Sequence, residues 1–264
     1  MKPSAVIYYR NDKEKEARNL SQKISSHILI NQICQAEEQV ISKGCDFVIV
    51  VGGDGTVIKV AKFTTCPIIG FKAGRVGFLA SYKLEEIDRF LKDLSQQRLL
   101  MEKRFMLTVK VNEVDYDAVN DVVFHLPSRR MGEFRLSFDG CSDLLFFADG
   151  ILISTATGST AYNLSLGGAI VTPVSEVIQI MPIAPYYLQN RSIVVPNEQR
   201  ITVDTLDICE VIVDGVIVGK VNSITVQKSS KHFTLLRPDY YDFFAVLKDK
   251  VGYGKGVTNE VDRG

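Results

Sequence analysis

The side chain best placed to do chemistry is Asp54, in the glycine-rich string Gly52-Gly53-Asp54-Gly55-Thr56. An apolar run, residues 47–51, leads into this string, and residues 57–61 follow it with the spacing of a short helix. Glycines let backbone N–H groups approach an anion at the positive N-terminus of a helix. The string matches neither G-x-G-x-x-G nor G-x-x-x-x-G-K-[ST]. It predicts a phosphate-binding turn of another kind between a strand and a helix.

A carboxylate in the middle of a phosphate loop needs a physical reason. A phosphate ~4 Å from Asp54, at an effective dielectric of ~20, is repelled by about 4 kcal/mol per charge pair. The dipole at a helix N-terminus stabilises an anion by only ~0.3–1 kcal/mol. Asp54 must therefore face a cation, accept the proton of a hydroxyl, or lie away from the phosphate, and general-base or Mg²⁺-assisted phosphoryl transfer meets the first two conditions. The alternative is that Asp54 or Thr56 merely caps the helix and the glycines form a tight turn.

Two further clusters carry polar side chains suited to a nucleotide. The string 154–162, Ser-Thr-Ala-Thr-Gly-Ser-Thr-Ala-Tyr, places five hydroxyls and a Tyr ring around Gly158, directly after a β-rich run. Such a turn can bind a polyhydroxylated, aromatic ligand by hydrogen bonds and stacking, or it can be a set of self-bonded Ser/Thr turns. Asn120-Asp121 sets an amide beside a carboxylate, which suits a base edge and a ribose hydroxyl. Its alternative is an exposed turn.

Other residue types exclude several functions. The three histidines are far apart, and the five cysteines are odd in number with no C-x-x-C pair, so we expect no metal site and reduced, buried thiols. With 31 Lys+Arg against 31 Asp+Glu the net charge is zero, which argues against nucleic acid as a partner. The longest clean apolar run, 47–51, is far below the ~18 residues of a membrane span. No signal-peptide pattern opens the sequence, and we expect a cytoplasmic protein without a membrane partner.

The elements that position these clusters change in character along the 264 residues. Residues 1–100 alternate strands, at 4–9, 47–51 and 66–71, with helical spacings, which predicts an α/β domain with a mostly parallel sheet. Residues 101–237 hold short β-rich runs separated by turns, which predicts an all-β domain, an antiparallel sandwich or barrel. Asp139-Gly140 and Asp214-Gly215 favour type I′ hairpin turns. The last predicted element is a helix over 239–251, with Tyr240, Phe243, Phe244 and Leu247 on one face.

The clusters together resemble those of the NAD kinase family, ATP-dependent enzymes that phosphorylate the 2′-hydroxyl of the adenosine ribose of NAD. The similarity also includes Gly74-Arg75-Val76-Gly77-Phe78-Leu79 and Asp149-Gly150, and it extends over most of the chain in the same order. The 52–56 string alone is shared with lipid kinases and, loosely, phosphofructokinases. The resemblance implies a smaller α/β domain of residues 1–100, to which residues 238–264 return with their helix, and a sandwich-like NAD-binding domain of residues 101–237. It also implies a homodimer or homotetramer.

The resemblance assigns roles to residues of this sequence. Asp54 would accept the proton of the 2′-hydroxyl, and Mg²⁺ or another divalent cation would arrive largely with ATP. The residues facing the ATP phosphates would be Gly52, Gly53, Gly55 and Thr56. NAD would be contacted by Asp54, Gly55, Lys59, Phe78, Asn120, Asp121, Arg130, Asp149, Thr157, Thr160, Ala161, Tyr162, Asn163 and Ser165. For Lys59 the alternative is a solvated helix lysine.

Two positions depart from the family pattern. Ala156 stands where many members have Pro, which loosens the turn. Phe147 stands where many have Arg, two positions before the Asp-Gly pair, so another cation must hold the new 2′-phosphate. Arg130 or a neighbouring subunit is the candidate, and an Arg130→Ala variant with unchanged NAD and NADP affinities would exclude Arg130.

Two other functions remain open at this point. A lipid kinase shares the 52–56 string but leaves Asn120-Asp121 and the 157–162 string unexplained, and it predicts sedimentation with vesicles. A non-catalytic NAD(P) sensor would use the same loops with Asp54 as a cap, and it predicts tight NADP binding without turnover. The residues by themselves reach phosphoryl transfer to a nucleotide-like ligand, while NAD as the substrate depends on the resemblance.

Overall fold

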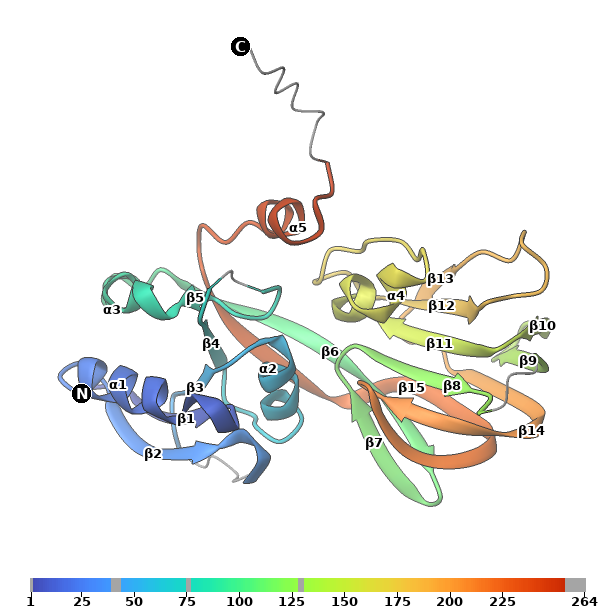
Figure 1. Ribbon diagram of the computed structural model, residues 1–264, viewed down its shortest axis with the longest axis horizontal. Coiled ribbons are helices and arrows are strands. Elements are labelled where there is room, and N and C mark those ends of the chain that lie inside the picture. The colour runs from blue at the N-terminus through green and yellow to red at the C-terminus, as the bar shows by residue number, and fades with distance from the viewer. Residues whose placement is uncertain (1, 39–43, 75–76, 128–130, 255–264) are drawn as a thin grey trace, which may run out of the picture. The chain divides into compact units, whose positions relative to one another are not determined.

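The computed structural model describes residues 2–38, 44–74, 77–127 and 131–254 (Figure 1). The chain divides into two compact units, one of Met1–Glu102 with Thr234–Gly264 and one of Lys103–Phe233. Two long strands, β6 (Leu99–Val111) and β15 (Val216–Pro238), carry the chain from one unit to the other. In the part of the chain that the structure describes, no helix is long and apolar enough to cross a bilayer.

The first unit is built on a parallel sheet. Its strands run in the order β2-β1-β3-β4, and both β5 and the end of β15 pair with β4. Their bounds are β1 Ser4–Tyr9, β2 Leu29–Gln35, β3 Phe47–Val51, β4 Ile68–Lys72 and β5 Tyr82–Lys83. Every residue of β3 is buried, as its apolar run predicts for a strand covered on both faces. The predicted parallel sheet is confirmed for these strands.

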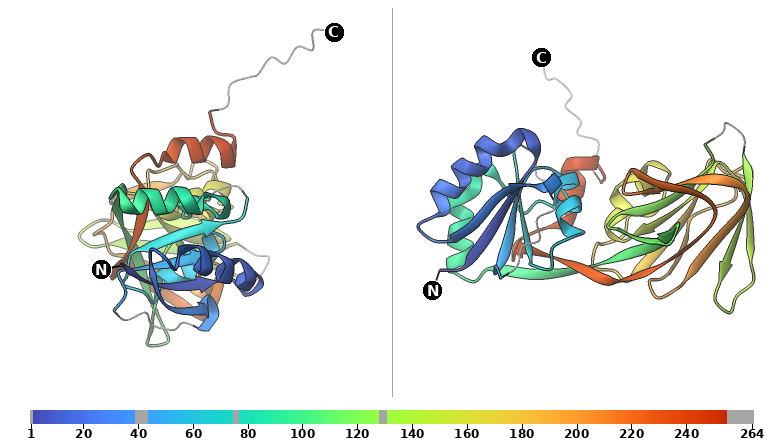
Figure 2. Two further views of the ribbon diagram at one scale, coloured as in Figure 1. Left: turned by 90° about the vertical axis from the view of Figure 1, so that its left-hand side faces the viewer. Right: turned by 90° about the horizontal axis from the view of Figure 1, so that it is seen from below.

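Helices cover both faces of this sheet (Figure 2). They are α1 Glu14–Ile24, α2 Asp54–Ala61 and α3 Ile87–Ser95, with 3-10 turns at Asn11–Lys13, Ala36–Glu38 and Leu84–Glu86. The α1 face of Ala17, Leu20 and Ile24 is buried, as its spacing predicts, and it shares one core with α3. The helix α2 lies on the opposite face of the sheet. Because only Gly52 and Gly53 lie between β3 and this helix, its N-terminus is at the carboxyl end of that strand.

The second unit is rich in antiparallel strands. Beside parts of β6 and β15 it holds β7 Val114–Ala118, β8 Asp121–His125, β9 Gly132–Phe138, β10 Leu144–Ala148, β11 Gly150–Thr155, β12 Val177–Ile183, β13 Ile193–Pro196 and β14 Ile201–Val213. The strand β8 lies between β11 and β14. Its Val122 and Phe124 enter the main core, while Val123 packs into a smaller cluster with Leu152 and Met181. Alternate residues of β8 are thus buried on opposite faces.

The structure differs from several sequence predictions. The edge strand β2 was not predicted, because most of its side chains are exposed or half-buried and give no continuous apolar run. The strand β15 is continuous where the sequence predicts three short runs, at 216–219, 223–227 and 233–236. Its pairing with β14 continues through the polar residues between the first two runs. Asp214 and Gly215 both have positive φ, 47° and 81°, as a type I′ turn requires. Asp139-Gly140 does not form such a turn, because only Gly140 has a positive φ.

The C-terminal helix α5 spans Phe243–Val251 and is shorter than predicted. Asp242 caps it by accepting hydrogen bonds from the backbone N–H groups of Phe244 and Ala245, at 2.8 and 3.2 Å. Gly252, with φ 75°, ends it. Only Leu247 of the predicted face is buried, and Phe244 is 64% exposed, so the apolar spacing did not identify a fully covered face.

Candidate active site

The glycine-rich string forms the predicted turn between β3 and α2. Gly52 N–H donates to the carbonyl of Phe71 on the neighbouring strand at 2.9 Å, and Gly53 is the residue before the helix. A Cβ on Gly52 would lie 2.4 Å from Oγ1 of Thr56, so this position requires glycine. Thr56 is buried against Gly52 and gives no side-chain cap to α2. The strand, turn and helix of the sequence analysis are confirmed.

Asp54 is the first residue of α2, and its carboxylate does not cap the helix. Oδ2 accepts a hydrogen bond from the N–H of Phe78 at 3.0 Å, and Oδ1 accepts one from the N–H of Leu79 at 3.3 Å. A Cβ on Gly77 would lie 2.0 Å from Oδ1, so the absence of a side chain there makes room for the carboxylate. The hydrogen bonds of the Asp54 side chain therefore hold the 52–56 string against Phe78 and Leu79, at the end of the 74–79 string.

The segment that orients Asp54 is itself held by a buried arginine. Arg237, 3% exposed, donates from Nη1 to the carbonyl of Ala80 at 2.8 Å and from Nη2 to the carbonyl of Phe78. The Tyr241 hydroxyl donates to the same Phe78 carbonyl at 3.3 Å, and its ring stacks 4.1 Å from the Arg237 guanidinium carbon. Arg237 is not predictable from the sequence, because nothing in its spacing separates it from a surface arginine.

Lys59 lies one helical turn after Asp54 and is engaged at the surface. Its Nζ is 2.8 Å from Oε1 of Glu37, and the two side chains are 57% and 41% exposed. This hydrogen bond lowers the pKa of Glu37. The structure thus gives Lys59 a carboxylate partner in the first unit.

Residues predicted to bind NAD meet at a pocket within the second unit. A cavity of about 490 Å³ is lined by Asn120, Asp121, Ala161 and Tyr162, together with Val123, His125, Ile212, Asp214 and Gly215. Its volume lies in the range of roughly 300–1,000 Å³ usual for small-molecule sites. Asp121 is only 5% exposed, so Asn120-Asp121 is not an exposed turn. The pocket therefore brings Asn120-Asp121 beside the end of the 154–162 string, Ala161 and Tyr162, but not its hydroxyl side chains.

Asp214 fixes the Asn120-Asp121 turn. Its carboxylate accepts hydrogen bonds from three successive backbone N–H groups, those of Val119, Asn120 and Asp121, at 2.9, 2.7 and 3.2 Å. The carbonyl of Asn120 lies against Gly158, where a Cβ would be only 2.1 Å away. The sequence analysis assigned Asp214 to hairpin chemistry alone and missed this second role.

The remaining residues predicted to bind NAD lie outside the lining of that pocket. Thr157 is buried, and its Oγ1 accepts from Nη1 of buried Arg104 at 3.2 Å. Asn163 is fully buried and donates from Nδ2 to the carbonyls of Ser159 and Ala169, while its Oδ1 has no hydrogen-bond partner among the described residues. Thr160 is half-buried and Ser165 is exposed.

Asp149 lies at the opposite end of β11 from the hydroxyl-rich turn. The strand between them spans roughly 17 Å at the usual rise per residue. Asp149 is half-buried, and its backbone bonds Ile183 and Leu126. The structure therefore does not bring Asp149 together with Thr157. Arg130 lies outside the residues that the structure describes.

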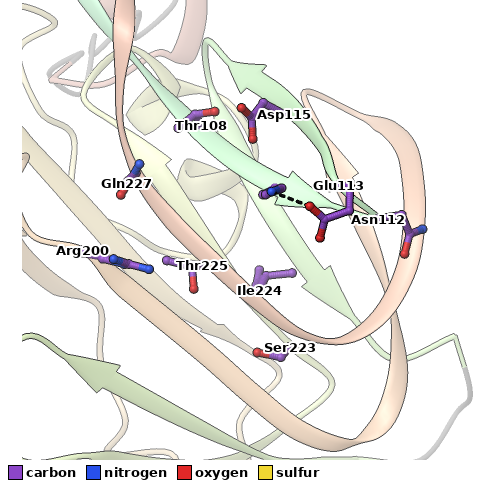
Figure 3. Close-up of a pocket in the computed structure, with 10 residues that line it drawn as sticks. Thr108, Asn112, Glu113, Asp115, Arg200, Ser223, Ile224, Thr225 and Gln227 are labelled. Atoms are coloured by element: carbon purple, nitrogen blue, oxygen red, sulfur yellow. Dashed lines mark ion pairs between the residues drawn. The ribbon is translucent and has the colours of Figure 1, made fainter.

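A second hollow of the same unit contains none of the predicted residues (Figure 3). It measures about 360 Å³ and is lined mostly by polar side chains of β6, β7 and β15, by the turn 112–113 and by Arg200, which precedes β14. At its rim Lys110 and Glu113 form an ion pair of 2.6 Å. We do not assign it to the active site.

Within the described residues, no cluster of three His, Cys, Asp or Glu side chains could hold a metal ion. Beside the phosphate loop the donor set is the single carboxylate of Asp54. Mg²⁺ prefers a few carboxylate oxygens together with substrate phosphates. The residues present therefore fit a divalent cation that is held mainly by a nucleotide's own phosphates.

The first unit carries a carboxylate in a glycine-rich turn between a strand and a helix, and the second unit has a pocket lined by an amide, a carboxylate and a Tyr ring. Each of these features is typical of nucleotide-dependent phosphotransferases. Family models match both units: the ATP-NAD kinase N-terminal domain over residues 5–99 and the ATP-NAD kinase C-terminal domain over residues 119–237. The chain belongs to the NAD kinase family and is a kinase. The resemblance inferred from the sequence is confirmed, and nothing supports a lipid kinase or a non-catalytic sensor.

Relatives and solved structures agree with this family. The chain is 42% identical to the NAD kinase of Thermotoga petrophila over 96% of this chain and 98% of that protein, and also 42% identical, with the same coverage, to the NAD kinase of Thermotoga maritima. The fold is similar to a crystal structure of yeast NADH kinase complexed with NADH, with a TM-score of 0.82, 18% identity and coverage of 97% and 89% of the two chains. It is also similar to an NAD kinase from Archaeoglobus fulgidus in complex with ATP, with a TM-score of 0.76, 24% identity and coverage of 93% and 98%.

Proposed function

We propose that Asp54 is the general base of an NAD kinase reaction in which the terminal phosphoryl group of ATP is transferred to the 2′-hydroxyl of the adenosine ribose of NAD. The new bond joins the ribose oxygen to the γ-phosphorus, and the bond from that phosphorus to the bridging oxygen breaks. ADP leaves, and the hydroxyl proton passes to Asp54. The observation that carries this proposal is the carboxylate of Asp54, held by two backbone N–H groups inside the phosphate loop.

The hydrogen bonds of Asp54 favour this role. An ionised carboxylate can accept about four hydrogen bonds, so two backbone donors leave lone pairs for a substrate hydroxyl. The fixed orientation holds the base ready for the proton, and a positioned general base contributes typically about 10²–10⁴-fold in rate. A ribose hydroxyl is a poor nucleophile without such a base.

The start of α2 suits the phosphates of ATP. Gly52, Gly53, Gly55 and Thr56 lie where β3 passes into α2. The N–H groups of Gly52 and Thr56 donate to the carbonyls of Phe71 and Gly53, while those of Gly53 and Gly55 stand at the helix start, where N–H groups lack intrahelical acceptors. The helix dipole favours an anion at the same place. Mg²⁺ bound to the phosphates would neutralise part of their charge and that of the transferring group.

The second unit supplies the chemistry for an adenosine. At its pocket, Asn120 offers an amide for a base edge, Asp121 offers a carboxylate for a ribose hydroxyl, and Tyr162 offers a ring for stacking. We retain as further NAD contacts the family positions Gly55, Lys59, Phe78, Arg130, Asp149, Thr157, Thr160, Ala161, Asn163 and Ser165. We also propose a cytoplasmic homodimer or homotetramer, which light scattering coupled to size-exclusion chromatography would test.

Product analysis tests the reaction. Purified protein incubated with NAD, ATP and Mg²⁺ should yield equal amounts of ADP and a phosphorylated dinucleotide, whose phosphorus NMR spectrum shows a new monoester on the 2′-oxygen. A phosphate on the 3′-oxygen, or ADP without phosphorylated dinucleotide, would contradict the proposed acceptor.

A further inference from the structure

Lys72 points toward the phosphate loop from the neighbouring strand. The register pairs Val51 with Phe71, so β3 and β4 reach the carboxyl edge of the sheet together. The Cε atom of Lys72 lies 3.9 Å from the place that a Cβ on Gly53 would occupy. The side chain of Lys72 therefore ends next to Gly53, the residue that precedes α2.

Lys250, in the C-terminal helix α5, lies close enough to Lys72 for the two charges to interact. The chain before α5 is fixed to the loop that orients Asp54, because Arg237 and Tyr241 both donate to the carbonyl of Phe78. The Phe78 and Phe243 rings also lie 5.8 Å apart, at the first turn of α5. Lys250 is in the last turn of this helix, and the charges of Lys72 and Asp54 both act on its amine.

Two lysine amines in contact are unfavourable when no anion is present. Two ammonium charges close together in a partly buried site repel each other. Burial and then the proximity of Lys72 lower the pKa of Lys250, while Asp54 acts in the opposite direction. Among the described residues, neither lysine has a carboxylate within ion-pair distance, in contrast to Lys59 with Glu37. An anion between the two amines would remove the repulsion.

We propose that Lys72 and Lys250 form a clamp that binds the phosphate chain of the phosphoryl donor at the start of α2. This inference rests on the proposed function and adds two residues to its donor site. The clamp lies at the carboxyl edge of a parallel sheet, where ligands of α/β sheets bind. The N–H groups at the N-terminus of α2 are beside it, and a triphosphate carries more negative charge than the diphosphate of NAD. The donor is therefore the ligand that the clamp fits.

The test separates donor binding from turnover. Lys72→Met and Lys250→Met remove one amine each with little change in side-chain length, and Lys248→Met on the same helix is the matched control. Calorimetry would measure the affinity of each variant for a non-hydrolysable ATP analogue with Mg²⁺ and for inorganic tripolyphosphate. Loss of a charged hydrogen-bonding partner, about 1.5–3 kcal/mol, predicts roughly 10–100-fold weaker binding of both ligands.

Steady-state kinetics supplies the second readout. Lys72→Met and Lys250→Met should raise KM for ATP or lower kcat while KM for NAD stays at the parent value, and Lys72→Arg should recover part of the loss. Donor affinity equal to that of the parent in both Met variants overturns the clamp, as does a rise confined to KM for NAD. If the parent binds the analogue through both lysines but makes no NADP, the clamp stands and the proposed reaction fails.

Discussion

Gly77 controls where the carboxylate of Asp54 lies, and Gly77→Ala tests that relation. The added methyl group would stand 2.0 Å from Oδ1 and 2.3 Å from Oδ2. Since a Cβ contact under 3.0 Å is essentially never observed, the carboxylate or its loop must move by at least 1 Å. A displacement of ~1 Å at a reacting group can cost about 10²-fold in rate. We therefore expect kcat to fall about a hundredfold.

The substitution should also weaken the two hydrogen bonds from Phe78 and Leu79, each about 1.5–3 kcal/mol for a charged acceptor. Gly77 does not have a positive φ, so alanine adds no backbone strain there. Gly74→Ala is the matched control in the same loop, because Gly74 has φ 77° and open space around its Cβ position. It should lower the free energy of unfolding by roughly 1–2 kcal/mol through backbone strain and leave kcat close to that of the parent.

The assay is the initial rate of NADP formation at saturating NAD and ATP, with the melting temperature of each variant measured in parallel. A folded Gly77→Ala protein with the kcat of the parent would refute the argument that close packing against residue 77 sets the geometry of the base. A loss of kcat in Gly74→Ala as large as in Gly77→Ala would attribute the effect to the loop in general.

Three other changes give separate tests. Asp214→Ala leaves three N–H groups without their charged acceptor and should therefore raise KM for NAD. The rise is about tenfold for each ~1.4 kcal/mol of binding free energy lost. An unchanged KM in steady-state kinetics would contradict this. Arg237→Met should lower both the melting temperature and kcat, because the carbonyls of residues 78 and 80 lose a buried donor; a stable, fully active variant would be inconsistent with that role. Burial raises the pKa of Cys34 to about 11 and of Cys209 to about 12, so a thiol reagent at mildly alkaline pH should modify exposed Cys141 first and reach these two only on unfolding.

Local sequence patterns predicted the parts of the fold that depend on local chemistry. The turn between β3 and α2 follows from an apolar run, adjacent glycines and helical spacing, and all three signals lie within residues 47–61. The strand β2 was missed, because an edge strand needs no continuous apolar pattern. The strand β15 was divided into three, because polar residues on an exposed face interrupt the pattern but not the pairing.

The sequence predicted the site residues whose type is unusual for their position. It did not predict ordinary residues that reach the site through contacts between segments far apart in the chain. Asp54 is recognisable as a carboxylate in a phosphate loop, but its partners Phe78 and Leu79 contribute only backbone N–H groups. Lys72 and Lys250 look like any surface lysine in the sequence. The pairing of β3 with β4 brings Lys72 to Gly53, and the position of α5 lets Lys250 interact with Lys72.

The central claim is that Asp54 accepts the proton of the attacking hydroxyl, and the most direct test is the rate of NADP formation by Asp54→Asn beside the parent. Asparagine keeps the size of the side chain and one acceptor oxygen but cannot act as the base. If Asp54 is the base, the parent forms NADP and the rate falls about 10²–10⁴-fold in a folded variant. A folded Asp54→Asn protein that forms NADP at the rate of the parent would contradict it.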